Sequence, residues 1–366
     1  MSGSILGKNF TIATWGESHG KALGVVIDGC PAGIPLSSQL IQTELDRRKP
    51  GSHAIYTQRQ EEDKVEILSG VFNGMTTGTP ISLIIYNKDR RSHDYDNIKD
   101  VYRPGHADFT YDEKYGFRDY RGGGRSSGRE TVSRVAAGAI AKNILAEFGI
   151  EVLAYTYSIG DINIDRENFD TSIIYENSVR MPDKIAAANA EDLIKSIKAK
   201  GDSIGGIIEC TVDGLPTGIG EPVFDKLEAV ISQAVMSIGA ARSIEFGMGT
   251  ALSHMKGSQA NDQYIIDNNG KIEKLTNHSG GIAGGISDGS PLSFKVAFKP
   301  TPSISLPQKT VTNDMKNTVL EIRGRHDPSI VPRAVPVVEA MTAIALVDLL
   351  FQRILSNIEF LKKALL

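Results

Sequence analysis

Cysteine is scarce in this sequence of 366 residues, which contains only two. Cys30 and Cys210 are too few and too far apart for a disulfide framework or a C-x-x-C metal site, so no metal site is expected. We therefore expect two free thiols in a reducing compartment. With 40% hydrophobic and 23% charged residues, the composition is that of a globular protein and excludes collagen, coiled coil and general disorder.

A surplus of positive charge is also absent. Forty Lys and Arg against 44 Asp and Glu give a formal net charge of −4, which argues against a broad face for nucleic acid or anionic membrane. Residues 1–8 lack the basic and apolar segments of a secretory signal. The most apolar stretch, 335–351, contains Pro336, Glu339 and Asp348 and is too short for a membrane span. We expect a cytoplasmic protein that binds neither nucleic acid nor membrane, with 335–351 as a buried helix.

Three sequence patterns occur twice, in the same order and about 200 residues apart. The pattern D-G-x-P-x-G-I follows an apolar run at 28–34 and again at 213–219. A glycine-rich segment at 70–82 matches 281–293, and G-R occurs at 124–125 and 324–325. The order indicates a tandem duplication, with chance reuse of turn residues as the alternative. We expect a single domain over 1–366, built of two pseudo-symmetric halves of about 1–190 and 191–366.

Hydrophobic periodicity predicts the main elements. Helices with a polar face are expected at 37–49 and 225–238, at a surface or interface. Segments 131–148 and 336–351 are apolar nearly all round, which is typical of helices buried on several sides. Strands are expected at 24–27, 83–86, 207–212 and 294–298. The fold class we predict is α+β, a β-α-β sandwich with helices packed between two antiparallel sheets.

Arginine is concentrated between residues 118 and 134. The five in this segment are Arg118, Arg121, Arg125, Arg129 and Arg134. Guanidinium groups stay charged in proteins, so their convergence without an anion is costly. The string R-G-G-G-R-S-S-G-R-E at 121–130 adds backbone N–H groups, hydroxyls and a following helix N-terminus, which suits phosphate or carboxylate. It matches neither a Rossmann nor a P-loop motif. The alternative is a solvated basic loop paired with Asp112, Glu113 and Asp119.

Other cations and two histidines extend this candidate site. Further anion-binding candidates are Arg47, Arg48, Lys49, Lys299, Arg323 and Arg325, which together favour a small polyanionic ligand. His19 and His106 lie in glycine-flanked turns, and a neutral imidazole beside arginines can give or take a proton near pH 7. A structural role for each histidine is the alternative. Asp327, close to Arg325, is expected to stay ionised.

The string G-E-S-H-G at 16–20 also fits G-x-S-x-G, the nucleophile elbow of α/β-hydrolases. An elbow requires a helix directly after Ser18, whereas 23–27 reads as a strand, which argues against a serine hydrolase. That enzyme class and a non-catalytic polyanion-binding protein using 118–134 are the alternative functions.

Five strings in order make the chain resemble the chorismate synthase family over nearly its whole length. They are G-E-S-H-G at 16–20 with D-G-x-P-x-G after it, L-D-R-R-x-P-G at 45–51, R-P-G-H-A-D at 103–108, R-G-G-G-R-S-S-G-R-E at 121–130 and G-R-H-D-P at 324–328. The resemblance implies a lyase that converts 5-enolpyruvylshikimate 3-phosphate to chorismate and phosphate by 1,4-anti elimination. This is the last common step of the shikimate pathway to the aromatic amino acids. The resemblance also implies reduced FMN as cofactor, a β-α-β sandwich with internal pseudo-symmetry, and a homotetramer.

The resemblance further implies residue roles. His19, with Ser18 beside it, corresponds to the acid that protonates the departing phosphate, and His106 to the group that manages charge at flavin N1. Asp327 with Ser127 corresponds to the pair that assists proton removal at flavin N5. The implied flavin-binding residues are Arg125, Ser126, Ser127, Gly239, Ala240, Gly285, Lys299, Pro300, Thr301, Pro302, Ser303 and Arg325. Arg48 and Arg134 correspond to further clamps of substrate or FMN, and Arg48 lies where the family is described as contacting NADP.

Two positions depart from the family pattern. Many relatives have an arginine shortly after the L-D-R-R-x-P-G string, where this chain has Ser52, His53 and Ala54. We therefore expect reduced FMN to come from elsewhere, with NADPH only an indirect source of reducing equivalents. Many relatives also have asparagine where Gly239 stands, which removes one flavin contact.

Overall fold

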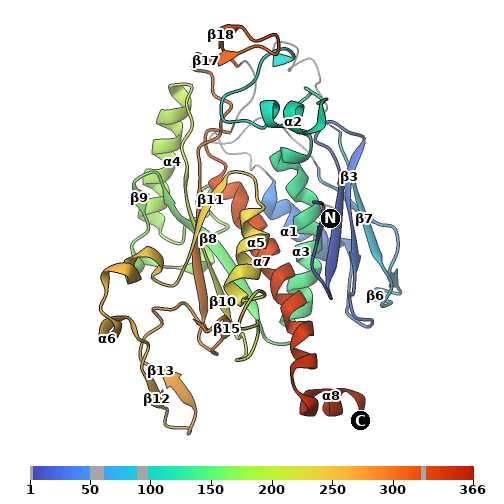
Figure 1. The fold of residues 1–366 in the computed structure, drawn as a ribbon, viewed down its shortest axis with the longest axis vertical. Coiled ribbons are helices and arrows are strands. Elements are labelled where there is room, and N and C mark those ends of the chain that lie inside the picture. The colour runs from blue at the N-terminus through green and yellow to red at the C-terminus, as the bar shows by residue number, and fades with distance from the viewer. Residues whose placement is uncertain (1–2, 50–61, 89–97, 323–326) are drawn as a thin grey trace.

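Two five-stranded antiparallel sheets form the outer layers of the protein (Figure 1). The computed structural model describes residues 3–49, 62–88, 98–322 and 327–366. The first sheet has the order β1-β2-β3-β7-β4, with β1 (Ile5–Leu6), β2 (Thr11–Gly16), β3 (Ala22–Asp28), β7 (Ile81–Tyr86) and β4 (Val65–Ile67). The second has the order β11-β16-β10-β8-β9, with β11 (Ala241–Phe246), β16 (Leu292–Phe298), β10 (Gly206–Asp213), β8 (Glu151–Ile159) and β9 (Ile162–Asn163).

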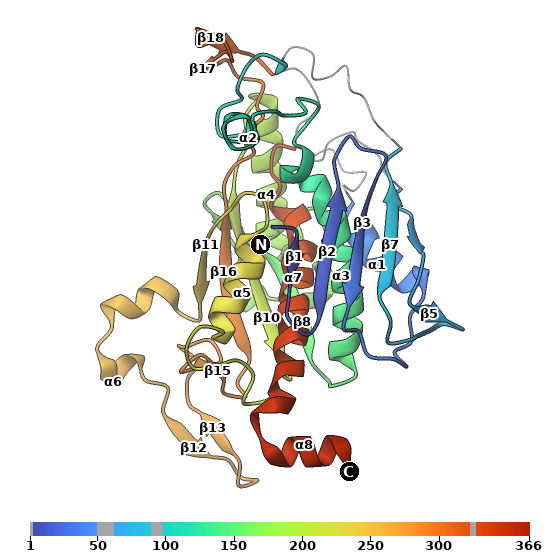
Figure 2. The ribbon, with the colours of Figure 1, turned by 45° about the vertical axis from the view of Figure 1, so that its right-hand side comes forward.

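Helices α1 (Ser38–Arg48), α3 (Thr131–Ala146), α5 (Leu227–Met236) and α7 (Val331–Arg353) fill the space between the two sheets (Figure 2). Outside that space lie α2 (Asp108–Tyr115), α4 (Lys184–Ala199), α6 (Gly257–Ala260) and α8 (Ile358–Leu365). Helix α3 packs on β3 and β7, and α7 packs on β8 and β10. The predicted α+β sandwich is therefore confirmed. Helices α3 and α7 form the central pair of this layer. Helices α1 and α5, which were expected at a surface or interface, each turn one apolar face to this pair.

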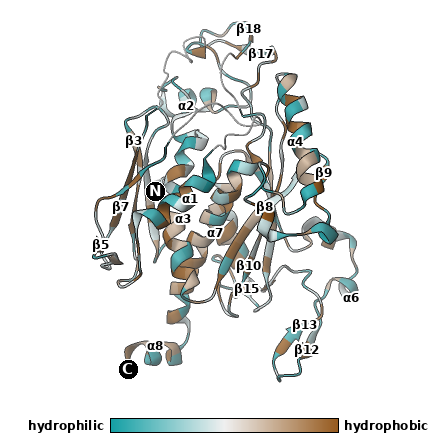
Figure 3. Cartoon of the chain, turned by 180° about the vertical axis from the view of Figure 1, so that it is seen from behind, coloured by the Kyte–Doolittle hydropathy of each residue, from teal (hydrophilic) through white to brown (hydrophobic). Residues whose placement is uncertain are grey.

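The central pair is apolar almost all round, as Figure 3 shows by colour. The two helices cross closely, since a Cβ placed on Gly138 of α3 would lie 2.2 Å from the Cβ of Ala340 in α7. Among the described residues, Val331–Ser356 is long and apolar enough to cross a membrane by length and composition, yet 89% of that apolar window is buried inside the protein. The expectation of a buried helix is confirmed, although α7 begins five residues before the predicted start and continues through Pro336.

Small hairpins follow the repeated motifs. They are β5 (Val71–Phe72) with β6 (Met75–Thr76), and β14 (Ile282–Ala283) with β15 (Ile286–Ser287). The Thr76 hydroxyl donates to Pro31 O at 2.6 Å and accepts from Ile34 N at 2.9 Å. The Ser287 hydroxyl makes the same two bonds, to Pro216 O at 2.6 Å and from Ile219 N at 2.9 Å. Equivalent positions of the two repeats thus make the same contacts.

The predicted division into two halves stays a prediction, and the strand order supports it. The series β2-β3-β7-β4 in one sheet has its counterpart in β8-β10-β16-β11 in the other. A Cβ on Gly29 would meet Asn9 O at 1.8 Å, and one on Gly214 would meet Gly149 O at 2.1 Å. Because β8 already belongs to the second sheet, we propose that the two halves meet near residue 150 rather than near 190.

The remaining elements extend from the sandwich. The hairpins are β12 (Tyr264–Ile266) with β13 (Ile272–Lys274), and β17 (Gln308–Val311) with β18 (Asn317–Leu320). Helix α4 was not predicted, although Asp183 caps it by accepting hydrogen bonds from Ile185 N and Ala186 N at 2.8 and 3.1 Å. Both cysteines are free and buried, and burial raises the pKa of the Cys30 thiol to about 11.

Candidate active site

The predicted site residues gather at one end of the sandwich, near α2, where α3 and α7 both begin (Figure 1). The turn at 17–20 between β2 and β3 lies here, as do two 3₁₀ turns at Gly124–Ser126 and Gly128–Glu130 that lead into α3. The N-termini of α3 and α7 both lie at this end, and the positive ends of their helix dipoles favour anions.

The turn that carries His19 packs directly on the glycine-rich loop. A Cβ on Gly122 would lie 2.7 Å from Cδ2 and 3.0 Å from Nε2 of the His19 ring, and 3.1 Å from Ser18 Oγ. Gly122 has a φ of +83°, so glycine is required here both for space and for backbone conformation. Ser18 is 1% exposed, and its hydroxyl has no hydrogen-bond partner among the described residues.

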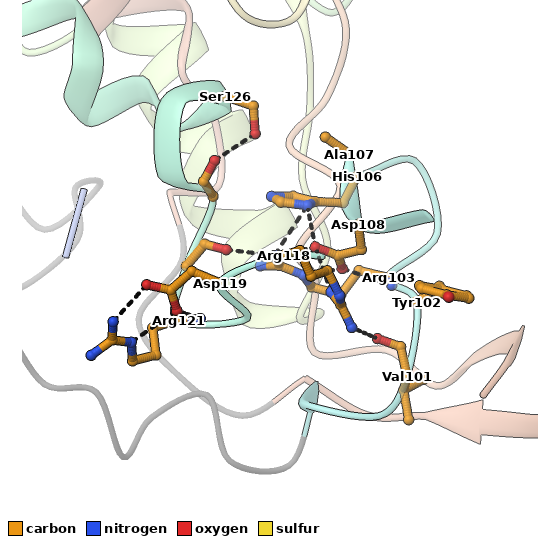
Figure 4. A network of polar contacts seen from close by, with 12 residues as sticks. Val101, Tyr102, Arg103, His106, Ala107, Asp108, Arg118, Asp119, Arg121 and Ser126 are labelled. Atoms are coloured by element: carbon orange, nitrogen blue, oxygen red, sulfur yellow. Dashed lines mark hydrogen bonds and ion pairs between the residues drawn. The ribbon is translucent and has the colours of Figure 1, made fainter. Parts of the chain in front are cut away.

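His106 lies beside Arg103 and Asp108, with Arg121 and Ser126 of the glycine-rich loop nearby (Figure 4). Its Nδ1 is 2.9 Å from Asp108 Oδ1 and 3.0 Å from Arg103 Nη2. The same Nη2 donates to Gly122 O at 3.0 Å. Gly122 therefore contacts the His19 ring directly and is linked to His106 through the side chain of Arg103. Burial opposes ionisation of Asp108, but hydrogen bonds from Arg103 and His106 outweigh it and hold the pKa of this carboxyl well below its usual range.

Asp63 joins two of the site's arginines in a buried network. It accepts from Arg48 Nη2 at 2.7 Å and is also paired with Arg129. Burial raises the pKa of Asp63, but the two guanidinium groups outweigh burial and hold it below its usual value. Burial lowers the pKa of Arg48 to about 10, with Arg333 and Arg129 adding to the shift and Asp63 opposing it. Arg48 is only 2% exposed, so its head group faces the protein interior.

Asp327 is paired with Arg333 in the first turn of α7. Within the described part of the chain, Arg48, Arg129 and Arg333 thus pair with two carboxylates, Asp63 and Asp327.

Arg125 and Arg134 converge on Glu130. Arg134 Nε donates to Glu130 at 2.7 Å and its Nη1 to Ser237 Oγ at 2.6 Å, which ties α3 to the end of α5. Arg125 donates to Thr14 Oγ1 at 2.7 Å and lies 3.5 Å from the Glu130 carboxylate. Ser127 Oγ accepts from the backbone N–H of the second residue along at 3.2 Å and caps the 3₁₀ turn before α3.

Segments from the second sheet complete the cluster. A Cβ on Gly239 would lie 3.8 Å from the carbonyl oxygen of Ser126, and one on Gly105 would lie 3.3 Å from the Cβ of Pro302. Lys299 Nζ donates to Gly105 O at 2.7 Å, and its backbone N–H donates to Ala240 O at 3.0 Å. Burial and the nearby Arg242 lower the pKa of Lys299. The structure therefore brings residues 239–240 and 299–302 of the second half against 105–106 and 126 of the first.

Some predicted residues lie elsewhere. Gly285 O accepts from Leu227 N at the start of α5, whereas Gly239 follows the end of that helix. The ten residues of α5 therefore separate the two glycines by about 15 Å within one chain. Arg323, Arg325 and the segment from Ser52 to Ala54 lie outside the described residues.

The structure overturns both alternative functions. Strand β3 begins four residues after Ser18, so the helix that a hydrolase elbow needs is missing. The side chains of Arg118, Arg125, Arg129 and Arg134 are at most 27% exposed and are paired within the protein. They form no open face for an extended polyanion. Arg121 is more exposed and is paired with Asp119, as the solvated-loop alternative expected.

Several residues of the site escaped the sequence analysis. Glu130 and Arg333 pair with Arg134 and Asp327, only four and six residues away. Asp63 and Asn87 hold the buried arginines and the His19 turn through partners 15 to 70 residues away. No local pattern marks such residues. An ionisable or amide side chain next to an apolar strand or inside a buried helix is the one available signal.

Comparison with known proteins agrees with this site. Residues 10–351 match the family model for chorismate synthase. Proteins named chorismate synthase from Lachnospira eligens and Lachnoclostridium phytofermentans are 56% and 57% identical to this chain, and each match covers 99% of both partners. The one from Methanococcoides burtonii is 55% identical over 95% of this chain and 96% of its own length. A crystal structure of chorismate synthase aligns with a TM-score of 0.77 at 32% identity, over 98% of this chain and 96% of that one. The chain belongs to the chorismate synthase family.

Proposed function

We propose that this chain converts 5-enolpyruvylshikimate 3-phosphate to chorismate and phosphate by 1,4-anti elimination, with reduced FMN as cofactor. Membership of the chorismate synthase family makes it a carbon–oxygen lyase that acts on phosphates, at the last common step of the shikimate pathway. One observation carries the residue assignment: Gly122 contacts the His19 ring and, through Arg103, reaches His106. Two titratable groups thus border one glycine-rich loop beside a cluster of arginines.

The arginine cluster and the two helix N-termini bind the anionic groups of the substrate. Arg48 and Arg129, held by Asp63, and Arg333 concentrate positive charge near the starts of α3 and α7. Phosphate and carboxylate oxygens match the fork of donors on guanidinium groups. This cluster fixes the substrate relative to the histidines, and fixed geometry lowers the barrier by removing orientational freedom before reaction.

His19 gives its proton to the departing phosphate, beside Ser18. The His19 ring packs against the Gly122 backbone, which holds the plane of the ring. Because glycine has no side chain, no bulky group crowds the ring at this contact. The bonds that described residues make to the His106 ring all use Nδ1. These contacts occupy Nδ1 and leave Nε2 to exchange a proton with a ligand. Asp327, with Ser127, assists removal of the ring proton.

The residues present fit a flavin phosphate and ring. Thr301 carries a buried hydroxyl with no hydrogen-bond partner among the described residues, as Ser18 does, and both are free to bind a polar ligand. The ligand-facing set is Arg125, Ser126, Ser127, Gly239, Ala240, Lys299, Pro300, Thr301, Pro302 and Ser303, with Arg325 and Gly285 as further proposed contacts. When bound, reduced FMN supplies electron density as phosphate leaves and accepts the ring proton. NADPH serves only as an indirect source of reducing equivalents.

We also propose a cytoplasmic homotetramer that needs no nucleic acid or membrane. Support for assembly comes from the β12–β13 hairpin, which projects from the body (Figure 1) and carries exposed apolar side chains. Tyr264, Ile266 and Ile272 on it are 63%, 66% and 71% exposed. Exposed apolar clusters of this kind mark protein–protein contacts.

Anaerobic turnover of 5-enolpyruvylshikimate 3-phosphate with photoreduced FMN, followed by chorismate absorbance, tests the proposal. Wild-type protein is expected to form chorismate under these conditions and not with FMN plus NADPH alone. His19→Ala and His106→Ala are each expected to lower kcat by roughly 10²- to 10⁴-fold. No chorismate from folded wild-type protein would overturn the activity, and wild-type turnover in both variants would overturn the roles of the histidines.

A further inference from the structure

Asn87 connects the His19 turn to the rest of the site. It follows the last residue of β7 and is 4% exposed. Its Nδ2 donates to Glu17 O at 3.1 Å and to Gly20 O at 2.9 Å, the carbonyls on either side of Ser18 and His19. Its backbone N–H donates to Lys21 O at 3.1 Å. One residue thus holds the turn from its first residue to its last.

The other end of the same amide contacts an arginine. Asn87 Oδ1 accepts from Arg129 Nε at 2.9 Å, and Arg129 is paired with Asp63. Asp63 in turn binds Arg48, whose Nη1 lies 3.4 Å from the hydroxyl of Thr131 at the start of α3. A continuous set of polar contacts therefore runs from the His19 turn to the buried arginines.

Only an amide of this length satisfies these partners. Two carbonyl acceptors on one side need an NH₂ group, and the guanidinium on the other needs an oxygen. Aspartate keeps the oxygen but offers no donor, and it sets a negative charge against two carbonyl oxygens. Alanine removes both functions and leaves buried polar groups unpaired.

We propose that Asn87 is a positioning residue, which fixes the orientation of His19 and couples it to the arginines that bind the substrate's anionic groups. Asn87 acts through His19 and exchanges no proton itself. The inference rests on the proposed role of His19 in protonating the departing phosphate.

The principal variant is Asn87→Asp, assayed with photoreduced FMN under anaerobic conditions. We expect kcat to fall about 100-fold because a displacement of about 1 Å of a reacting group has that effect. KM for the substrate is expected to change less than threefold, since the arginines keep their carboxylate partners. The added carboxylate is expected to raise the pKa of His19, so the alkaline limb of the kcat–pH profile moves to higher pH.

Asn177→Asp is the matched control. Asn177 Nδ2 donates to Ile173 O at 2.7 Å and to Met181 O at 2.8 Å, and its Oδ1 accepts from Met181 N at 3.1 Å. Asn177→Asp removes two amide N–H donors, as Asn87→Asp does, but in a loop outside the site. This variant is expected to keep the wild-type kcat and pH profile, whatever its melting temperature.

A double-mutant cycle with His19→Ala separates positioning from a general structural effect. If Asn87 acts through His19, Asn87→Asp lowers kcat in the wild-type background and causes no further loss in the His19→Ala background. Equal losses in both backgrounds, or a wild-type kcat and pH profile in Asn87→Asp, would overturn the inference alone. Wild-type turnover in His19→Ala would overturn the proposed role of His19, and the inference with it. Asn87→Ala goes through the same cycle with the same criteria should the aspartate variant fail to fold.

Discussion

At the scale of single residues, Asp63 is where the buried charges of the site converge. Its side chain is fully buried between Arg48 and Arg129, and its φ of +48° lies in the left-handed region that non-glycine residues seldom adopt. Such a conformation costs about 1–3 kcal/mol and persists only where surrounding contacts hold it. The two ion pairs are contacts of that kind.

Asp63→Asn is expected to lower the free energy of unfolding by about 3–5 kcal/mol, because it leaves two buried guanidinium groups without a counter-charge. Urea unfolding followed by circular dichroism measures the change. Asp119→Asn is the control, since Asp119 makes a bidentate but exposed pair with Arg121, and its loss is expected to cost less than about 1 kcal/mol. Equal effects of the two substitutions would contradict the assignment of Asp63 as the centre of a buried network.

Asp108 makes stability depend on pH. Its folded-state pKa lies below the unfolded value of about 3.9, so its contribution is fully present above that pH and is lost as the pH falls through the folded-state pKa. The melting temperature of the wild type is expected to fall on acidification below about pH 5. Asp108→Asn is expected to be less stable at pH 7 and to lose less on acidification. Parallel curves of melting temperature against pH would show that Asp108 does not contribute.

At the scale of elements, the crossing of α3 and α7 sets the thickness of the middle layer. Gly138 allows the closest approach, and the apolar surfaces on either side of it were evident from the sequence. The prediction of a buried helix pair was correct, but the crossing point was not predictable, because a glycine inside a helical pattern does not reveal which residue faces it.

Gly138→Ala tests this crossing. Alanine favours helix over glycine by about 1 kcal/mol, so the substitution would stabilise the protein if space allowed. With Ala340 Cβ only 2.2 Å from the new methyl position, we expect instead a loss of about 1–3 kcal/mol, seen as a lower melting temperature. Gly257→Ala, at a position in α6 where the added methyl would have no atom within 4 Å, is expected to be neutral or slightly stabilising. A higher melting temperature for Gly138→Ala would show that the helices can separate freely.

At the scale of the whole molecule, the two proposed halves meet through α3 and α7, and one end of the sandwich carries residues from both. Lys299 and Gly239 come from the second sheet's connections, and Gly105 and Ser126 come from the first half. The site therefore requires both halves. At the opposite end, the β12–β13 hairpin leaves apolar side chains exposed.

If the protein forms the proposed tetramer through this hairpin, the double substitution Ile266→Lys and Ile272→Lys shifts it toward smaller species, because charged side chains oppose burial of the hairpin against another copy. Light scattering coupled to size-exclusion chromatography measures the mass. Ile185→Lys, at a 65% exposed position on α4, is expected to leave the mass unchanged. A tetramer of unchanged stability in the double variant would exclude the hairpin from the assembly.

The sequence by itself determined helices α1, α3, α5 and α7 and strands β3, β7, β10 and β16, because hydrophobic periodicity and turn residues act locally. It also determined the repeated motifs, and its short strings identified His19, His106 and the arginines at 121–134 as candidates. Only the tertiary structure decided which side chains bind these candidate residues and fix their positions. Asn87 contacts Arg129 across 42 residues, and Arg129 contacts Asp63 across 66. These contacts exist because the start of β3, the end of β7 and the start of α3 meet at one end of the sandwich, and no local pattern encodes that meeting.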